Sequence, residues 1–128
     1  MNGKFLVDTN VIIKLLNSDV RAIEMFDSAD EIHIPVIVAG ELLYGAQNST
    51  RKQENMTIFN DFLSQYIIVN IDAPTAETYG EIKAQLKKDG VTIPENDLWI
   101  AATAKTKQYM LMTFDSHFDK VNGLQVMN

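Results

Sequence analysis

The sequence predicts an α/β domain whose sheet is mainly parallel and covered by helices on both faces. Short apolar runs alternate along the chain with longer segments whose apolar residues recur at helical spacing. Strands buried on both faces read as continuous apolar runs, and their alternation with helices is typical of this class. The chain has 128 residues, of which 46% are hydrophobic and 22% charged. This length supports one hydrophobic core, so we expect a single domain over residues 1–128.

The first half of the chain predicts two strands and four helices. The apolar run at residues 5–7 predicts a buried strand, and the turn-forming Asp8 leads from it into a helix. A second strand is expected at residues 32–34, where Pro35 ends it. The helix over 36–44 is apolar nearly all round, which indicates burial or an interface. The four helices span residues 10–16, 20–28, 36–44 and 51–64.

The second half predicts two more helices and three more strands. Pro74 opens a helix over 75–88, and the pair Asp89-Gly90 closes it, because proline suits the first turn and glycine the end of a helix. The other helix covers residues 96–107. The strands are expected at residues 66–71, 109–114 and 124–127.

Charge and composition exclude several classes of protein. Eleven basic residues face 17 acidic ones, a net charge of −6 that disfavours nonspecific binding to nucleic acid. The absence of cysteine excludes disulfides, thiolate zinc sites and cysteine nucleophiles, and it fits a reducing compartment. The N-terminus carries no recognisable export signal, and the longest nearly uncharged stretch, residues 32–45, is shorter than the roughly 20 apolar residues of a membrane helix. We therefore expect a cytoplasmic protein that does not engage a membrane.

Asp8 and Asp115 each follow a predicted strand. If the strands at residues 5–7 and 109–114 are parallel neighbours, both acids lie at the same edge of the sheet, where ligands bind in α/β proteins. Aspartate is also common after strands because its side chain supports turns and caps helices. Both interpretations stay open for each residue alone.

Glu41 lies on an apolar helical face. Its neighbours one turn away are Ile37, Val38 and Tyr44, and no lysine or arginine occurs between Asp30 and Thr50. An isolated buried carboxylate is costly, so such a group is normally neutralised, paired or bound to a cation. This pattern favours a functional role for Glu41, with a distant basic partner as the alternative.

Asp97 stands near the start of its predicted helix, in phase with the apolar stripe of Ile100, Ala101 and Ala104. An acid at this place commonly caps the helix or stabilises its first turn. Asn96 or Glu95 can serve that purpose instead, which leaves Asp97 free for another role. The sequence does not decide between the two.

The four acids lie on separate segments, so only folding can bring them together. Clustered carboxylates repel one another and raise each other's pKa unless a cation is present. An all-oxygen site suits a hard ion such as Mg2+ or Mn2+, and such ions activate water for attack on phosphodiesters. Without these four acids, 13 acidic residues face 11 basic ones, a net of −2, so the rest of the chain need not repel RNA.

At these residues the sequence resembles the PIN-domain family, and more closely its VapC-like branch, the toxins of type II toxin-antitoxin pairs. The matching segments follow the order of the family over nearly the whole chain: LVDTNVII at 6–13, VAGELLYG at 38–45, ENDLWIAATA at 95–104 and TFDSHF at 113–118. Trp99 is bulkier than the aliphatic residue common at its position. The acid pattern is complete, so this departure affects only the expected packing.

The resemblance implies a fold, a metal site and an activity. The acids around the metal map to Asp8, Glu41, Asp97 and Asp115, and the residues that support them or a nearby water map to Thr9, Asn10, Asn96 and Thr113. The implied activity is a Mg2+- or Mn2+-dependent endoribonuclease that uses metal-activated water and leaves 5′-phosphate and 3′-hydroxyl ends on RNA. The resemblance also implies a homodimer and a cognate antitoxin that covers the acidic cleft.

Three alternatives compete with this hypothesis. A phosphoacceptor receiver module would carry adjacent acids after the first strand and a lysine after the last, whereas Asp8 precedes Thr9-Asn10 and Asp115 stands in place of the lysine. A phosphatase with a D-x-D loop would need an acid at Asn10. The third is a catalytically silent PIN-like binding protein, against which the complete acid set argues.

We assign no role to His33 or His117. His33 is interpreted as an ordinary residue of its predicted strand, and His117 as a residue near the site or in a loop.

Overall fold

The five strands of the computed structural model form one parallel sheet. The structure describes residues 3–128; Met1 and Asn2, part of the stretch in which no export signal is expected, lie outside them. The strand order is β3-β2-β1-β4-β5, and every neighbouring pair runs parallel. The strands are β1 (Lys4–Val7), β2 (Glu31–Pro35), β3 (Ile67–Val69), β4 (Met110–Met112) and β5 (Val126–Met127). The predicted fold class is confirmed.

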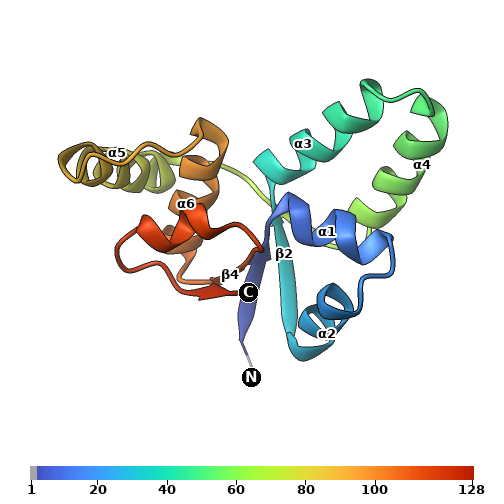
Figure 1. The fold of residues 1–128 in the computed structure, drawn as a ribbon, viewed down its shortest axis with the longest axis horizontal. Coiled ribbons are helices and arrows are strands. Elements are labelled where there is room, and N and C mark those ends of the chain that lie inside the picture. The colour runs from blue at the N-terminus through green and yellow to red at the C-terminus, as the bar shows by residue number, and fades with distance from the viewer. Residues whose placement is uncertain (1–2) are drawn as a thin grey trace.

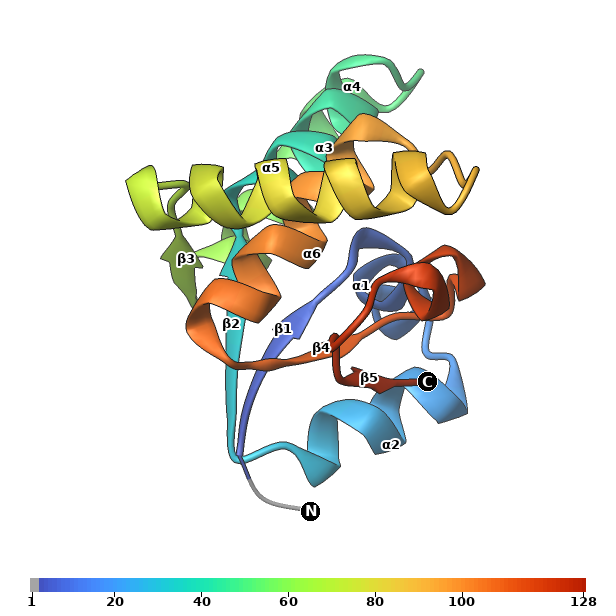
Figure 2. The same cartoon turned by 90° about the vertical axis from the view of Figure 1, so that its left-hand side faces the viewer.

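Helices cover both faces of this sheet (Figures 1 and 2). Four of them connect β1 to β2 and β2 to β3 on one side: α1 (Thr9–Leu16), α2 (Val20–Ser28), α3 (Val36–Gln47) and α4 (Lys52–Leu63). On the other side, α5 (Ala73–Lys88) and α6 (Glu95–Lys107) pack on each other and return the chain from β3 to β4. The strand order therefore reverses between β1 and β4, and α/β sheets bind ligands beyond the carboxyl ends of strands at such a place.

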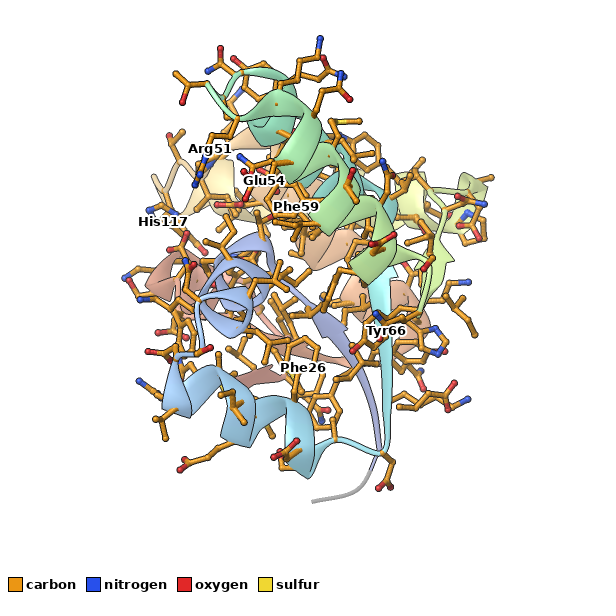
Figure 3. The ribbon with its side chains drawn as sticks, turned by 90° about the vertical axis from the view of Figure 1, so that its right-hand side faces the viewer. Phe26, Arg51, Glu54, Phe59, Tyr66 and His117 are labelled. Carbon is orange, nitrogen blue, oxygen red and sulfur yellow. The ribbon has the colours of Figure 1, made fainter. Side chains whose placement is uncertain are left out.

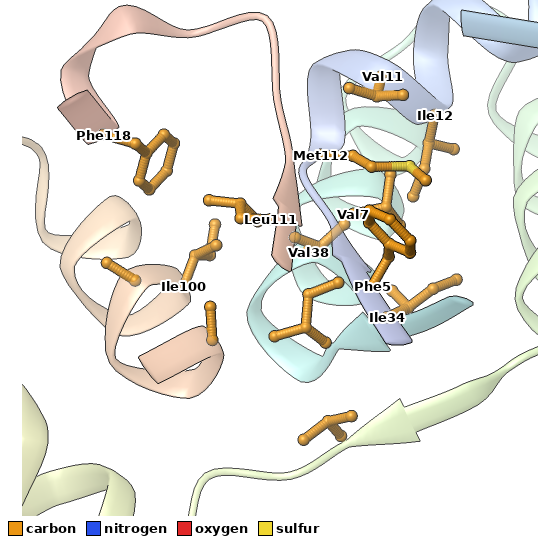
Figure 4. Close-up of a cluster of buried hydrophobic side chains, with 14 of the residues drawn as sticks. Phe5, Val7, Val11, Ile12, Ile34, Val38, Ile100, Leu111, Met112 and Phe118 are labelled. Carbon is orange, nitrogen blue, oxygen red and sulfur yellow. The ribbon is translucent and has the colours of Figure 1, made fainter. Parts of the chain in front are cut away.

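The central strands separate two apolar layers, as the alternation of side chains along a strand requires. In β4, Leu111 points toward Ile100 of α6 and toward Phe118, whereas Met112 points to the opposite side, where Ile12 of α1 lies (Figure 4). All five side chains are fully buried. This packing fixes β1 and β4, and with them the residues that follow each strand.

Aromatic contacts complete the outer layers. Phe26 of α2 lies near Tyr66 and packs edge-on against it (Figure 3). It also packs tilted against Phe62 of α4, and the ring centroids are 6.3 Å apart in both pairs. On the other side, Trp99 stacks on Tyr79 with centroids 3.9 Å apart, so the bulky residue finds its partner on α5. Within residues 3–128, no helix is both long and apolar enough to span a bilayer.

Three strands are shorter than the sequence predicted. The expected strand at 109–114 loses both ends because the N–H of Tyr109 bonds the carbonyl of Ala104 at the end of α6, while that of Phe114 bonds the side chain of Asn10. The strands expected at 66–71 and 124–127 shrink to β3 and β5. A short 3-10 helix, η1 (Ser116–Lys120), was not predicted.

Candidate active site

Asp8 is the most buried of the four acids. It follows β1 directly, its N–H donates to the carbonyl of Met112 in β4 at 2.9 Å, and its side chain is 4% exposed. Oδ1 accepts a hydrogen bond from the N–H of Thr9 at 2.9 Å, which caps the start of α1. Oδ2 accepts from Oγ1 of Thr113 at 2.7 Å and from Nδ2 of Asn10 at 3.3 Å. Asp8 therefore both caps α1 and lies at the carboxyl edge of the sheet, so the two interpretations of this residue are compatible.

Burial disfavours the charged form of this carboxylate. It raises the pKa of Asp8 from 3.8 to about 6, although the hydrogen bonds from Thr113 and Thr9 act in the opposite direction. The negative charges of Asp97 and Glu41 add to the rise. Asp8 is therefore a carboxylate whose charge the fold tolerates poorly without a cation nearby.

Glu41 joins the site from α3 and is half-buried, so it is less buried than its apolar neighbours on the helix indicated. Its helix runs past the edge of the sheet, as the 69% exposure of Tyr44 shows, so its surroundings are less apolar than its own helix indicated. Oε1 accepts from Oγ1 of Thr9 at 2.7 Å, and Oε2 accepts from Nδ2 of Asn96 at 3.3 Å. Neutral donors, rather than a distant base, hold this carboxylate.

Asp97 lies in the first turn of α6 without capping it. The N-cap position belongs to Pro94, which makes no side-chain cap bond, so the capping interpretation of Asp97 is wrong. Burial raises the pKa of Asp97, and the charges of Asp115 and Glu41 add to this, whereas the hydrogen bond with His117 lowers it. The side chain is turned toward the other acids instead of toward its own helix end.

Asp115 enters from the segment between β4 and η1. Its Oδ1 accepts from the N–H of His117 at 2.9 Å and caps η1, so it too has a local structural role. Its own N–H donates to Oγ1 of Thr113 at 3.0 Å, and this hydroxyl donates in turn to Asp8. Thr113, fully buried, thus couples the acids that follow the neighbouring strands β1 and β4.

His117 belongs to the site, although the sequence assigned it no role. Its Nδ1 lies 3.1 Å from Oδ2 of Asp115 and 3.4 Å from Oδ2 of Asp97. The imidazole is half-exposed at the edge of the molecule (Figure 3). In the sequence, only its position two residues after Asp115 could have indicated that His117 lies near the site. Its contact with Asp97 joins residues 20 positions apart, so it can be seen only in the folded structure.

The structure brings all four acids together at the reversal point of the sheet. The negative charges of Asp97 and Glu41 help to raise the pKa of Asp8, and those of Asp115 and Glu41 help to raise the pKa of Asp97. The four neighbouring polar residues singled out by the resemblance all bond an acid of this cluster: Thr9, Asn10, Asn96 and Thr113. Within residues 3–128, no lysine or arginine forms an ion pair with any of the four acids.

This donor set fits a hard divalent cation. Carboxylate oxygens are ligands that suit Mg2+ and Mn2+. Ligand atoms of Asp97, Asp115 and His117 lie within 4.8 Å of one another, close enough to share one ion. A cation would also offset the burial and the repulsion between acids that together raise the pKa values of Asp8 and Asp97.

Comparison with known proteins places the chain among proteins of one family. The model of the PIN domain matches residues 5–124. Ribonuclease VapC2 of Haemophilus influenzae is 32% identical over 130 residues, which cover 98% of this chain and 97% of that protein. Ribonuclease VapC1 of Methanocaldococcus jannaschii is 36% identical over 127 residues, covering 97% and 87%.

Solved structures have the same fold. DNA-bound VapBC from Salmonella typhimurium matches with a TM-score of 0.89 at 27% identity, over 97% of this chain and 96% of that one. VapBC2 from Rickettsia felis, bound to a DNA fragment from their promoter, matches with a TM-score of 0.87 at 29% identity, over 98% of both chains. A toxin-antitoxin complex from Klebsiella pneumoniae matches at 25% identity with a TM-score of 0.74, over 96% and 95%.

Proposed function

The chain belongs to the PIN domain family, and we propose that it is the endoribonuclease toxin of a type II toxin-antitoxin pair. Relatives named as VapC ribonucleases cover almost the whole chain at up to 36% identity. The observation that carries the proposal is the convergence of four acids, without a lysine or arginine partner in residues 3–128, at the reversal point of the sheet. A cluster of this kind suits hydrolysis of a phosphodiester better than the signalling chemistry of a receiver module.

The metal site in this proposal is formed by Asp8, Glu41, Asp97 and Asp115, which hold Mg2+ or Mn2+. The bound ion supplies an activated water and charge stabilisation at the phosphate. Asp8 contributes a fixed oxygen, because three hydrogen bonds and burial hold it in one position. Asp97 and Asp115 contribute oxygens from the more exposed side of the cluster.

Four polar residues position these acids in the proposal. Thr9 holds Glu41 while its backbone holds Asp8, so one residue sets the distance between two acids. Asn96 orients the other oxygen of Glu41. Asn10 and Thr113 fix Asp8 against the end of β4. Such outer partners restrict the rotamers of ligands and tune the affinity for a metal.

The proposed reaction is hydrolysis of the RNA backbone. A water oxygen bonds to phosphorus, the bond from phosphorus to the 3′ oxygen breaks, and that oxygen leaves with a proton. The products are a 5′-phosphate and a 3′-hydroxyl end. The four acids would hold the cation that stabilises the scissile phosphate and activates the water. His117 borders these acids on their more exposed side.

The proposal includes two protein partners. Relatives of known structure are VapBC complexes, and one is a toxin-antitoxin complex, which supports a cognate antitoxin for this chain. We also propose a homodimer in the cytoplasm. The apolar helix α3 exposes Tyr44 to 69%, which supports a contact between copies of the chain. Light scattering on the purified toxin measures the dimer directly.

Cleavage of total cellular RNA by the purified protein tests the activity. The reactions contain Mg2+ or Mn2+, with EDTA and the variant Asp97→Asn as controls, and the new ends are mapped by sequencing. Discrete cuts with 5′-phosphate ends that disappear in both controls support the proposal. Absence of cutting by protein shown to be free of antitoxin, or cutting that persists in EDTA, contradicts it.

A further inference from the structure

The ring of Phe114 is held at the edge of the acid cluster. Phe114 directly precedes Asp115, and its N–H donates to Oδ1 of Asn10 at 3.1 Å. The same Asn10 donates through Nδ2 to Asp8. The side chain of Asn10 therefore fixes the backbone of Phe114 relative to Asp8, to which it is hydrogen-bonded, and Asp115 follows directly in the chain.

Two cationic side chains gather on this ring. Nζ of Lys14 lies 5.9 Å from the ring centroid, and Cζ of Arg21 lies 5.2 Å from it. Lys14 is one helical turn beyond Asn10 on α1, and Arg21 stands in the first turn of α2. A cation within about 6 Å of an aromatic centroid is attracted to the ring and loses freedom of orientation. The ring thus orders two positive charges around the residue that precedes Asp115.

These two charges have no carboxylate partner within residues 3–128, in a chain with an acidic excess. Three other cations, Arg51, Lys83 and Lys107, each pair with a carboxylate. Lys14 and Arg21 are exposed, so both head groups are available to an anion from solution. Because the ring that holds them belongs to the residue before Asp115, a negatively charged substrate of the acid cluster is the natural anion.

We propose that Lys14 and Arg21, ordered on the ring of Phe114, hold the phosphate backbone of the RNA strand beside the bond that is cut. This inference rests on the proposed ribonuclease function and adds a substrate-positioning site to it. Without their cation the four acids repel an approaching polyanion, and a pair of positive charges on the neighbouring residue would offset this repulsion. The ring serves the cations rather than a base, because two head groups already lie on it.

This arrangement predicts a particular kinetic signature. Lys14 and Arg21 contact the strand away from the reacting phosphate, so their loss raises KM and leaves kcat little changed. Each phosphate contact on a single strand contributes about −0.7 to the slope of log affinity against log salt. Loss of both cations therefore weakens binding and makes the negative slope of log affinity against log salt shallower by about 1.4.

Binding of a labelled polyuridine strand of about 20 nucleotides tests the proposal, since single strands bind through backbone phosphates. All proteins carry Asp97→Asn, so that no strand is cut. Lys14→Ala with Arg21→Ala is compared with Lys87→Ala with Lys88→Ala, which removes two exposed charges at the end of α5. Lys14→Arg with Arg21→Lys, which keeps both charges, rescues binding if charge is the cause. Phe114→Leu keeps an apolar side chain and weakens binding by about two- to fivefold, the value of a cation–π contact at an exposed site.

The expected result is a lower affinity and a smaller salt slope in the first double variant and wild-type behaviour in the second. Equal losses in both double variants, or none in the first, overturn the proposal. Unchanged RNA binding combined with lost antitoxin binding also overturns it and assigns the patch to a protein contact. Metal-dependent cleavage by the wild-type protein, measured in parallel, decides separately whether the ribonuclease function itself stands.

Discussion

The two ends of the sheet treat carboxylates in opposite ways. Near the amino ends of the strands, Oε1 of Glu31 lies 2.6 Å from Nε2 of His33, and this hydrogen bond, with the charge of Lys4, lowers the pKa of Glu31. At the carboxyl ends, burial and neighbouring acids raise the pKa of Asp8 to about 6 and also raise that of Asp97. One end compensates negative charge, and the other accumulates it.

The difference shows where the fold gives up stability for function. A domain that only had to fold would pair or neutralise its acids, as it does around Glu31. At the carboxyl ends, hydrogen bonds from neutral groups such as Thr9 and Thr113 orient the acids but leave their charge in place. Perturbed carboxylates of this kind mark candidate functional sites, and the divalent cation of our proposal would offset their charge.

Removing one carboxylate from the carboxyl end has the largest expected effect. Asp97→Asn and Glu41→Gln each reduce RNA cleavage by more than about 100-fold, because a loss of outer partners alone costs 10- to 100-fold. Both variants stay folded, since each removes a poorly compensated charge. The matched variant Glu31→Gln at the amino end keeps full activity. Initial rates on RNA and circular dichroism test this prediction, and equal activity in all variants would separate the acids from catalysis.

The pH dependence of stability distinguishes the two ends next. The folded metal-free protein holds a proton on Asp8 up to about pH 6, whereas an unfolded aspartate loses it near 3.8. Asp8 therefore lowers the free energy of unfolding progressively as pH rises from about 4 to 6, by up to about 3 kcal/mol. In Asp8→Asn this loss is absent. Urea unfolding of both proteins across this pH range, in EDTA, measures the difference, and identical pH profiles would refute the burial of charge at Asp8.

Thr113→Val tests the link between the acids after β1 and β4. The change keeps the side-chain shape but leaves the N–H of Asp115 without its acceptor and removes one of the three hydrogen bonds to Asp8. It should lower the free energy of unfolding by about 1–3 kcal/mol and weaken Mn2+ binding by about tenfold or more. Thr103→Val is the control, because that buried hydroxyl bonds only a carbonyl of its own helix. Equal effects of the two variants on Mn2+ binding would show that Thr113 has no special part in the site.

Glu31→Gln gives the smallest effect and the opposite sign. The lowered pKa of Glu31 means that its contribution to stability is present above about pH 4.5 and is lost as pH falls through the lower pKa of the folded state. The variant is therefore slightly less stable than the wild-type protein at pH 7 and equal to it in strong acid. Thermal unfolding at both pH values measures this, and a variant more stable at pH 7 would contradict the pairing with His33.

The sequence was sufficient where local pattern decides the structure. Apolar runs between helical segments predicted the parallel sheet, and the places of Asp8 and Asp115 after two strands predicted their meeting, because β1 and β4 are indeed neighbours. The roles of the acids in holding a metal stay predictions. Their convergence was visible because each acid stands at an element end or on an apolar face.

The remainder depends on contacts between distant segments. The strand at β4 ends early because Asn10, 104 residues away, takes the N–H of Phe114. Glu41 is only half-buried because its helix passes the edge of the sheet, which neighbours on its own helix do not reveal. His117 joins the site through Asp97, and Phe114 gathers its two cations from two helices. None of these follows from local periodicity.

Calorimetric titration with Mn2+ at neutral pH tests the contrast between the two ends most directly. Three full-length proteins are compared: the wild type, Asp97→Asn and Glu31→Gln. We predict the same affinity for the wild type and Glu31→Gln, and an affinity at least about tenfold lower for Asp97→Asn. No binding to the wild type, or equal binding to all three proteins, would contradict the assignment of a cation to the carboxyl end of the sheet.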